Sequence, residues 1–236
     1  MQHQNISPDN KSEYKITTLD NIHIESTAKL FTTVFCEGEP LTRHLQVPYD
    51  DFYPFAKEVV EKAATDKLSM VAVDHENKVI ACIISEDISD PFMPNVNAYP
   101  TLAPIFEFIE RLSKSFTHAR VFTEKKIAHM WVTAIDNKYK GKGLSKKIND
   151  AGETKLKEDG FEFGYAEFTS EINERWMNKF DVFERCSVLK FEDQTDERLK
   201  GLPGRATSYV WPMIPTVNFL TLYKNYIHSD HSVFDN

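Results

Sequence analysis

The chain has 236 residues, of which 41% are hydrophobic and 27% charged, a composition typical of a globular protein. Its net charge of −8 argues against nucleic acid as the main partner and is compatible with a cationic one. The three cysteines, Cys36, Cys82 and Cys186, exclude a disulfide framework and a Cys/His zinc module, and they favour a reducing compartment. We therefore expect a cytoplasmic protein without a metal.

No apolar run of the chain is long enough to predict a membrane span. The longest, residues 79–84, is far shorter than the roughly 20 residues that a bilayer requires. The first residues also lack the charged and then apolar pattern of a secretory signal. Residues 1–12 are polar and without periodicity, which predicts a flexible tail before a single domain over residues 13–236.

Hydrophobic periodicity predicts alternating strands and helices. In chain order these are a strand at 14–19, a helix from 21 that ends at Gly38 and Pro40, a helix at 49–66, a hairpin of strands at 69–74 and 78–86, a helix at 101–116, a strand at 126–135, a helix at 144–158, a strand at 161–169, a helix at 171–180, and closing strands at 183–191 and about 217–222 with a polar loop between them. This order predicts an α/β fold: a mixed central sheet of about seven strands flanked by helices on both faces.

A glycine-bearing loop, residues 138–143, follows the strand at 126–135. The chain has only 8 glycines, yet Gly141 and Gly143 lie together where this strand turns into a helix. Glycine lets the backbone approach a ligand closely, and the first turn of a helix offers unpaired N–H groups. With Lys140 and Lys142 beside them, these groups suit a phosphate or pyrophosphate. A corner that simply needs flexible residues explains the loop equally well, and the loop matches neither a P-loop nor the dinucleotide fingerprint.

The loop resembles the acetyl-CoA-binding motif of the GNAT superfamily of N-acetyltransferases, (Q/R)-x-x-G-x-(G/A). Lysine stands at the first position and serine at the last, and both changes are mild. The resemblance implies that the loop backbone holds the pyrophosphate of acetyl-CoA and that the preceding strand pairs with the pantetheine arm. The cofactor-binding residues that it implies are Val132, Thr133, Ala134, Ile135, Lys140, Gly141, Lys142, Gly143, Leu144 and Ser145.

A second resemblance narrows the family to the insect-type arylalkylamine (dopamine) N-acetyltransferases. Residues 35–41 contain Glu39-Pro40-Leu41, and those proteins carry Glu-Pro-Leu at the equivalent place, before a helix and a hairpin. Residues 169–177 resemble their serine-rich stretch before the last helix. The resemblance extends from about residue 14 to 192 and fades beyond; it assigns no role to residues 193–236.

Acetyl transfer to an amine has two proton requirements, because the amine must lose a proton before attack and the leaving thiolate of CoA should gain one. The resemblance favours Glu39 as the general base, although most glutamates are exposed loop acids. His129, on the central strand, is the runner-up, and a satisfied core histidine is its more common role.

The general acid is harder to identify. Many relatives have a tyrosine where Met177 aligns, and methionine cannot donate a proton. The resemblance aligns Thr169 and Asn173 with serines proposed to take part in the insect-type enzymes; only Thr169 keeps a hydroxyl. Without a relay, the thiolate leaves with help from water and a helix dipole. Cys186 has no flanking His or Lys, so we expect a buried apolar residue rather than a nucleophile.

The acceptor must bind beside the thioester. We expect a backbone N–H near Val132 or Thr133 to stabilise the oxyanion. An aromatic amine needs an apolar slot, for which Phe35, Phe52, Tyr53 and Phe92 are candidates with His129 beside them, although aromatic residues at helical spacing are more often core.

The sequence predicts an N-acetyltransferase that uses acetyl-CoA and a small primary amine, favouring an arylalkylamine. The alternatives are the same fold acting on a polyamine, an amino sugar or a protein lysine, and a non-catalytic acyl-CoA-binding module. We expect a monomer or homodimer without nucleic acid or membrane partners.

Overall fold

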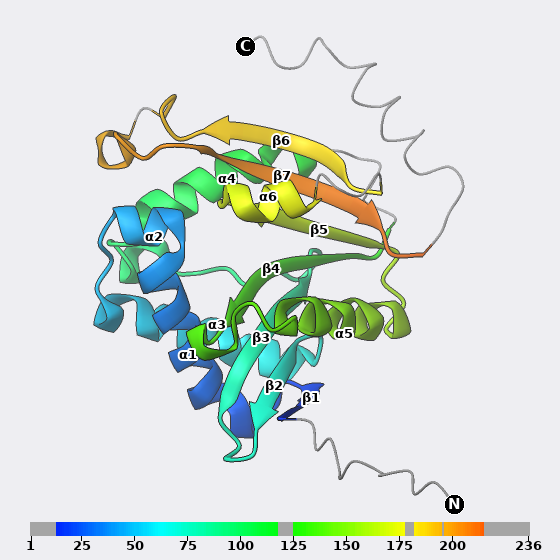
Figure 1. Cartoon of the computed structure of the whole chain (residues 1–236). Helices are drawn as coiled ribbons and strands as arrows, with labels where there is room; N and C mark the ends of the chain where they lie inside the picture. Colours follow the sequence, from blue (N-terminus) through cyan, green and yellow to red (C-terminus); the bar gives the residue numbers. More distant parts are fainter. Residues whose placement is uncertain (1–12, 118–124, 178–181, 195, 215–236) are drawn as a thin grey trace, which may run out of the picture.

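A single mixed sheet organises the chain. The computed structural model describes residues 13–117, 125–177, 182–194 and 196–214. Seven strands in these residues form one sheet in the order β1-β2-β3-β4-β5-β7-β6 (Figure 1). Neighbouring strands are antiparallel except β4 and β5, which run parallel. The predicted mixed sheet of seven strands with flanking helices is confirmed.

The bounds of the elements follow the hydrophobic pattern of the sequence closely. The strands are β1 (Tyr14–Thr18), β2 (Met70–Asp74), β3 (Val79–Asp87), β4 (Ile127–Ile135), β5 (Phe163–Phe168), β6 (Glu184–Lys190) and β7 (Arg205–Pro212). The helices are α1 (Ile24–Gly38), α2 (Pro40–His44), α3 (Tyr49–Asp66), α4 (Ala103–Thr117), α5 (Leu144–Glu158) and α6 (Glu171–Met177). The predicted helices at 49–66 and 144–158 have the observed bounds.

Two predictions of secondary structure need correction. Gly38 does end α1, but Pro40 begins a second helix, α2, rather than only stopping the first. Proline suits the first position of a helix, because the N–H group that proline lacks would have no carbonyl acceptor within the helix there. The strand that pairs with β5 and β6 is β7 at 205–212, inside the predicted polar loop. Its Thr207 and Ser208 are fully buried, so the run lacks the expected alternation.

Some predictions fall outside the described residues. These are the tail at 1–12, the last residues of the helix predicted at 171–180 and the strand predicted at 217–222. None of the helices in the described ranges is long and apolar enough to cross a membrane.

Helices cover both faces of the sheet. Cys82 and Ile84 of β3 pack in a core with α1 and α3, whereas Ile83 points to the opposite face and packs against α5. Gly152 brings α5 close to the sheet, because a Cβ there would lie 2.9 Å from a methyl carbon of Ile83. Figure 1 shows α5 and α6 in front of the sheet and α4 behind β6 and β7.

The parallel strands β4 and β5 separate soon after they pair. Only Ile127–His129 of β4 pair with Phe163–Tyr165 of β5. Beyond this point β4 continues beside β3 and β5 continues beside β7. We call the two diverging segments, residues 130–135 of β4 and 166–168 of β5, the split. Their facing edges carry backbone N–H and C=O groups that do not pair across it.

A bulge in β4 marks the start of the split. Ser85 of β3 pairs with Met130 and its neighbour Ile84 pairs with Val132, so Trp131 is an extra residue in β4. A bulge of this kind bends the strand and increases its twist, which turns β4 away from its neighbour. The local register of β3 and β4 therefore helps to separate β4 from β5.

Candidate functional site

The loop after β4 presents backbone N–H groups and positive charge at the start of α5. Gly141 and Gly143 have φ of 75° and 79°, left-handed values that glycine adopts without strain. Gly143 is the N-cap of α5, and the N–H groups of the first helical turn have no carbonyl within the helix to bond to. A Cβ on either glycine would meet no atom within 4 Å, so the loop is open.

Five lysines and no acidic residue occur between positions 138 and 147, in a chain whose net charge is −8. Lys140 and Lys142 are exposed, and the Nζ of Lys142 lies 5.2 Å from the centre of the Tyr139 ring. Leu144 is buried against the sheet, whereas Ser145 is exposed in the first turn of α5. Fixed positive charge beside a helix N-terminus suits a phosphorylated ligand.

The four β4 residues predicted to contact pantetheine lie along the split. Val132 and Ala134 are buried in the core beneath α1 and α3, and Ile135 packs with α5. Thr133 is exposed, and its hydroxyl donates to Asn149 Oδ1 over 3.4 Å. Their side chains therefore fix β4, while the backbone edge that faces β5 is the part available to a ligand.

Glu39 lies between α1 and α2 and caps α2. Its Oε1 accepts from the backbone N–H of Leu41 over 3.1 Å. Its Oε2 accepts from the N–H and the hydroxyl of Thr42 over 2.7 and 2.6 Å. The sequence Glu-Pro-Leu-Thr thus builds its own helix start, with Pro40 at the first position and the carboxylate bound to the free N–H groups.

Glu39 also reaches across the molecule to the end of β5. The Thr169 hydroxyl donates to Glu39 Oε1 over 2.6 Å, although the two residues are 130 positions apart in the chain. The structure therefore brings together two of the three residues predicted to be catalytic. Asn173, the third, is exposed on α6. The side chain of Met177 lies outside the described part of the structure.

His129 lies between two glutamates that the sequence analysis did not select. Its Nδ1 is 2.9 Å from Glu86 Oε1 of β3, and its Nε2 is 2.6 Å from Glu167 Oε2 of β5. An imidazole that donates to both carboxylates is protonated and has no lone pair with which to accept a proton. This arrangement gives no support to His129 as a general base.

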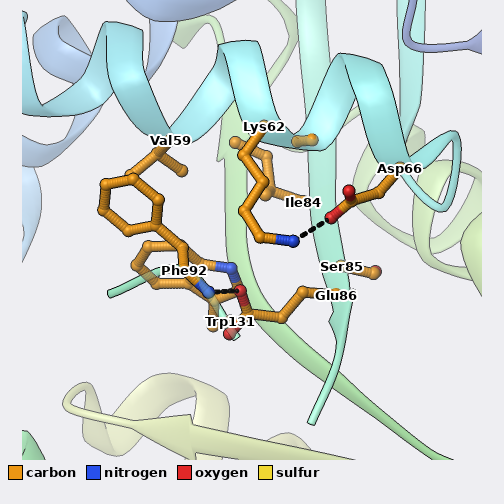
Figure 2. A pocket seen from close by; sticks show the side chains of 9 residues that line it. Val59, Lys62, Asp66, Ile84, Ser85, Glu86, Phe92 and Trp131 are labelled. Atoms are coloured by element: carbon orange, nitrogen blue, oxygen red, sulfur yellow. Dashed lines mark hydrogen bonds and ion pairs between the residues drawn. The ribbon is translucent and has the colours of Figure 1, made fainter. Parts of the chain in front are cut away.

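The Glu86 side of this cluster lines a small recess beneath α3 (Figure 2). Figure 2 shows Lys62 reaching from α3 toward Asp66, while the Glu86 carboxylate accepts from the N–H of Phe92 over 2.7 Å. Trp131, the bulged residue of β4, closes one side of this recess.

The predicted aromatic slot is part of the core in this structure. Phe52 is only 3% exposed, and its ring centre lies 5.9 Å from that of the half-buried Phe35. Tyr53 is half-buried and stacks on Tyr49, with ring centres 5.9 Å apart. Substrate contact at these residues stays a prediction, to which the burial of Phe52 adds no support.

The Cys36 and Cys82 thiols are not activated as nucleophiles, because burial raises the pKa of each. Cys36 is half-buried, and burial together with the neighbouring charge of Glu37 raises the pKa of its thiol to about 11. Cys186 is half-buried, and its thiol lies 3.8 Å from the Glu184 carbonyl oxygen. Across the ranges that the structure describes, no group of three or more His, Cys, Asp or Glu residues is arranged to hold a metal ion.

Comparison with known proteins identifies the fold. No family model and no curated protein matches the sequence. Among solved structures, arylalkylamine N-acetyltransferase 2 from Aedes aegypti superposes with a TM-score of 0.70 at 14% identity, covering 86% of this chain and 100% of that one. The chain has the GNAT fold.

Two further structures share this GNAT architecture. The C-terminal condensation domain of Ebony, in complex with β-alanyl-dopamine, has a TM-score of 0.73 at 13% identity and covers 84% of this chain and 98% of its own. A polyamine N-acetyltransferase from Drosophila melanogaster has a TM-score of 0.62 at 14% identity, covering 84% of this chain and 99% of its own. The predicted resemblance to insect-type arylalkylamine N-acetyltransferases is confirmed at the level of the fold.

Proposed function

We propose that this protein transfers an acetyl group from acetyl-CoA to a small primary amine. One observation carries the proposal: β4 and β5 separate after three paired residues, and the glycine loop that starts α5 follows the free end of β4. The diverging strand offers unpaired amides to a pantetheine arm, and the loop offers N–H groups to a pyrophosphate. A solved structural neighbour with a TM-score of 0.51, the NatC complex, is bound to CoA, which also supports this donor.

In this proposal the chain's own residues hold acetyl-CoA at both ends. The N–H groups of residues 142–145 bind the pyrophosphate, with Lys140 and Lys142 adding positive charge. The backbone edge of residues 132–135 binds the pantetheine amides. A β4 N–H near Val132 or Thr133 donates to the thioester oxygen as negative charge develops on it.

The proposed base, Glu39, reaches the amine through Thr169. Its carboxylate already accepts four hydrogen bonds, which is about the capacity of its lone pairs. An attacking amine therefore gives its proton to the Thr169 oxygen as the Thr169 hydroxyl proton passes to Glu39 Oε1. The new C–N bond forms, the C–S bond breaks, and the CoA thiolate takes a proton from water. Glu39 then gives its proton to the hydroxide that remains, so that amine and thioester become amide and free thiol.

An arylalkylamine is the favoured acceptor because structural neighbours named for this substrate class are among the best superpositions. Other neighbours are named for agmatine and polyamines, so a polyamine is the main alternative. Amino sugars, protein lysines and a non-catalytic acyl-CoA-binding role are the remaining ones. The net charge of −8 favours any cationic acceptor equally.

A matched pair of glycine variants tests the donor site. Gly143 and Gly160 lie at opposite ends of α5, both are exposed, and their φ values are 79° and 82°. Gly143→Glu and Gly160→Glu therefore introduce the same strain and the same charge. Acetyl-CoA at about 100 times its dissociation constant should stabilise the wild type by about 2.7 kcal/mol, which raises the melting temperature by roughly 5–10 °C.

The proposal expects Gly160→Glu to keep this shift and Gly143→Glu to lose it, with ATP and NAD as control ligands. A wild-type protein that acetyl-CoA does not stabilise would refute the donor site. If acetyl-CoA binds but no amine releases CoA from it, the protein has the non-catalytic acyl-CoA-binding role and is not an acetyltransferase.

A further inference from the structure

Three charged side chains connect the three central strands of the sheet. Glu86 of β3, His129 of β4 and Glu167 of β5 are joined by contacts of 2.9 and 2.6 Å at the two ring nitrogens. Their side chains are 8%, 15% and 6% exposed, respectively. We call these three residues the ion triad. It consists of one cation between two anions, almost removed from water.

The ion triad is held rigidly on both sides. The second oxygen of Glu86 accepts from the N–H of Phe92 over 2.7 Å, and the second oxygen of Glu167 accepts from the Ser113 hydroxyl over 2.7 Å. Each carboxylate is thereby oriented by a loop or a helix outside the strands. The imidazolium ring has its plane set by two fixed acceptors rather than by one.

The ion triad lies where β4 and β5 part. His129 and Tyr165 are the last residues that pair between these strands, and Glu167 is the next residue of β5 on the same face. The bond from His129 to Glu167 thus extends the connection one step past the backbone ladder. It ties the two strands together at the closed end of the split.

The ring of His129 also supports the bulge of β4. It stacks on Trp131, with ring centres 5.9 Å apart and planes inclined by 22°, and Trp131 stacks in turn on Phe92 at 6.4 Å and 20°. A cation over an indole face is favourable, and the gain increases when both groups are desolvated. The bulged residue is therefore packed between the ion triad and the core.

We propose that His129 is a positioning residue. Its ion pair with Glu167 and its stacking on Trp131 fix the point at which β4 separates from β5. This point in turn sets where the β4 N–H groups meet the thioester. This inference rests on the proposed acetyl transfer. A displacement of about 1 Å in such a donor can reduce turnover about a hundredfold. His129 itself does not touch the reacting atoms in this account.

The position of the ion triad favours this role over a purely stabilising one. A buried ion pair is often no better for stability than well-packed apolar residues, because desolvation offsets its attraction. Directional bonds to two neighbouring strands, however, fix geometry in a way that apolar packing does not. The place where this geometry matters is the split, and the ion triad lies at its closed end.

Two variants separate charge from shape. His129→Gln is neutral, whereas His129→Lys keeps a cation between the carboxylates. We expect His129→Gln to lower kcat about 10- to 100-fold, while the dissociation constant of CoA changes less than about threefold. His129→Lys should recover at least about a third of the kcat that His129→Gln loses. Glu167→Gln should give the same pattern as His129→Gln. Asp66→Asn, which removes a carboxylate of the same recess outside the ion triad, should leave kcat unchanged.

Hydrogen exchange of the unliganded protein provides a readout that does not depend on activity. His129→Gln and Glu167→Gln should exchange faster than the wild type at residues 130–135 and 166–168, with β2 unchanged. The positioning role would be overturned if the variants exchanged at the wild-type rate in these segments. It would also be overturned if His129→Lys turned over as slowly as His129→Gln. Failure of the proposed acetyl transfer would appear separately, as a wild type without turnover but with the predicted exchange pattern.

Discussion

Glu39 combines two tasks, because the same carboxylate caps α2 and accepts from Thr169 at the end of β5. Substituting it therefore changes both the helix start and the proposed proton path. Glu39→Gln removes the charge and one acceptor oxygen. We expect turnover to fall about 10²- to 10⁴-fold, the range of a lost general base, and the free energy of unfolding to fall by about 1 kcal/mol, the usual value of a helix cap.

Asp74→Asn is the matched control for capping. The Asp74 carboxylate accepts from the backbone N–H groups of Glu76 and Lys78 in the β2–β3 hairpin, away from the split. Asp74→Asn should reduce the free energy of unfolding by a similar amount and leave turnover near the wild-type value. Equal turnover in the two variants would remove Glu39 from the mechanism. Thiol release and chemical denaturation supply the two measurements.

The second prediction at this scale concerns pH. Burial alone would lower the pKa of His129, but the charges of Glu167 and Glu86 and their hydrogen bonds outweigh it and raise the pKa to about 10. The charged or titratable groups around His129 are its two partners Glu86 and Glu167, the ring of Tyr165, and Lys62 and Asp66 of the recess beside Glu86. Because the folded pKa exceeds the unfolded value of about 6.5, the stabilisation from this proton is complete below pH 6.5 and disappears as the pH rises through about 10.

The free energy of unfolding of the wild type should therefore decline between about pH 7 and pH 10, by on the order of 1 kcal/mol per pH unit. His129→Gln lacks the group and should show a flatter profile over the same interval. Denaturant titrations at four or five pH values measure both slopes. Parallel slopes would mean that His129 is not protonated in the folded state.

Sequence reasoning at the residue scale reaches only those features that neighbours in the chain carry. Glu39-Pro40-Leu41 and the two loop glycines are contiguous motifs, so their spacing is visible without a structure. The ion triad joins residues that are 43 and 38 positions apart. Nothing local distinguishes Glu86 or Glu167 from a surface acid, because only the sheet register brings them to His129.

At the scale of elements, α5 depends on close packing against β3. Gly152 has no room for a side chain, since a Cβ would lie 2.9 Å from Ile83 Cγ2. We expect Gly152→Ala to destabilise the protein by about 1–2 kcal/mol, because overpacking outweighs the better helix propensity of alanine. At Gly38, the last residue of α1, a Cβ would meet nothing within 4 Å. Gly38→Ala should therefore stabilise by about 0.5 kcal/mol.

Chemical denaturation of the two alanine variants compares them directly. A stabilising Gly152→Ala would show that α5 can move away from the sheet without loss. Such movement would also shift the glycine loop at its N-terminus, so acetyl-CoA binding should be measured on the same samples.

The elements that sequence periodicity predicted well are the amphipathic helices. In α5, Leu144, Ile148 and Leu156 recur on one face and are buried, so the pattern and the bounds agree. Strand β7 has no such signal, because Thr207 and Ser208 are enclosed between β5 and β6 and look like loop residues in sequence. The register shift at Trp131, which helps to separate β4 from β5, is not visible in the composition.

At the scale of the whole molecule, charge is distributed unevenly. The chain carries −8 overall, yet the loop at the start of α5 is rich in lysine. We expect the affinity for acetyl-CoA to fall several-fold between 0.1 M and 1 M salt, as the screening length shrinks from about 10 Å to 3 Å. The double variant Lys140→Gln/Lys142→Gln should bind more weakly at low salt and depend less on salt.

The double variant Lys190→Gln/Lys200→Gln makes the same change of net charge on the β6–β7 side of the sheet, where both lysines are exposed. It should retain the wild-type salt dependence in calorimetric titrations. A salt dependence that follows net charge alone would weaken the case for a phosphate site at the loop.

The bond between Thr169 and Glu39 also has a consequence for the order of events during synthesis. It closes a loop of 130 residues, which carries an entropic cost of about 4 kcal/mol, so it forms only after the strands between have assembled. A ribosome that adds roughly 5–20 residues per second delivers Thr169 on the order of 10 s after Glu39. The nascent chain therefore exposes Glu39 for a long interval as an ordinary helix cap, and Glu39 can accept a proton through Thr169 only when β5 is in place.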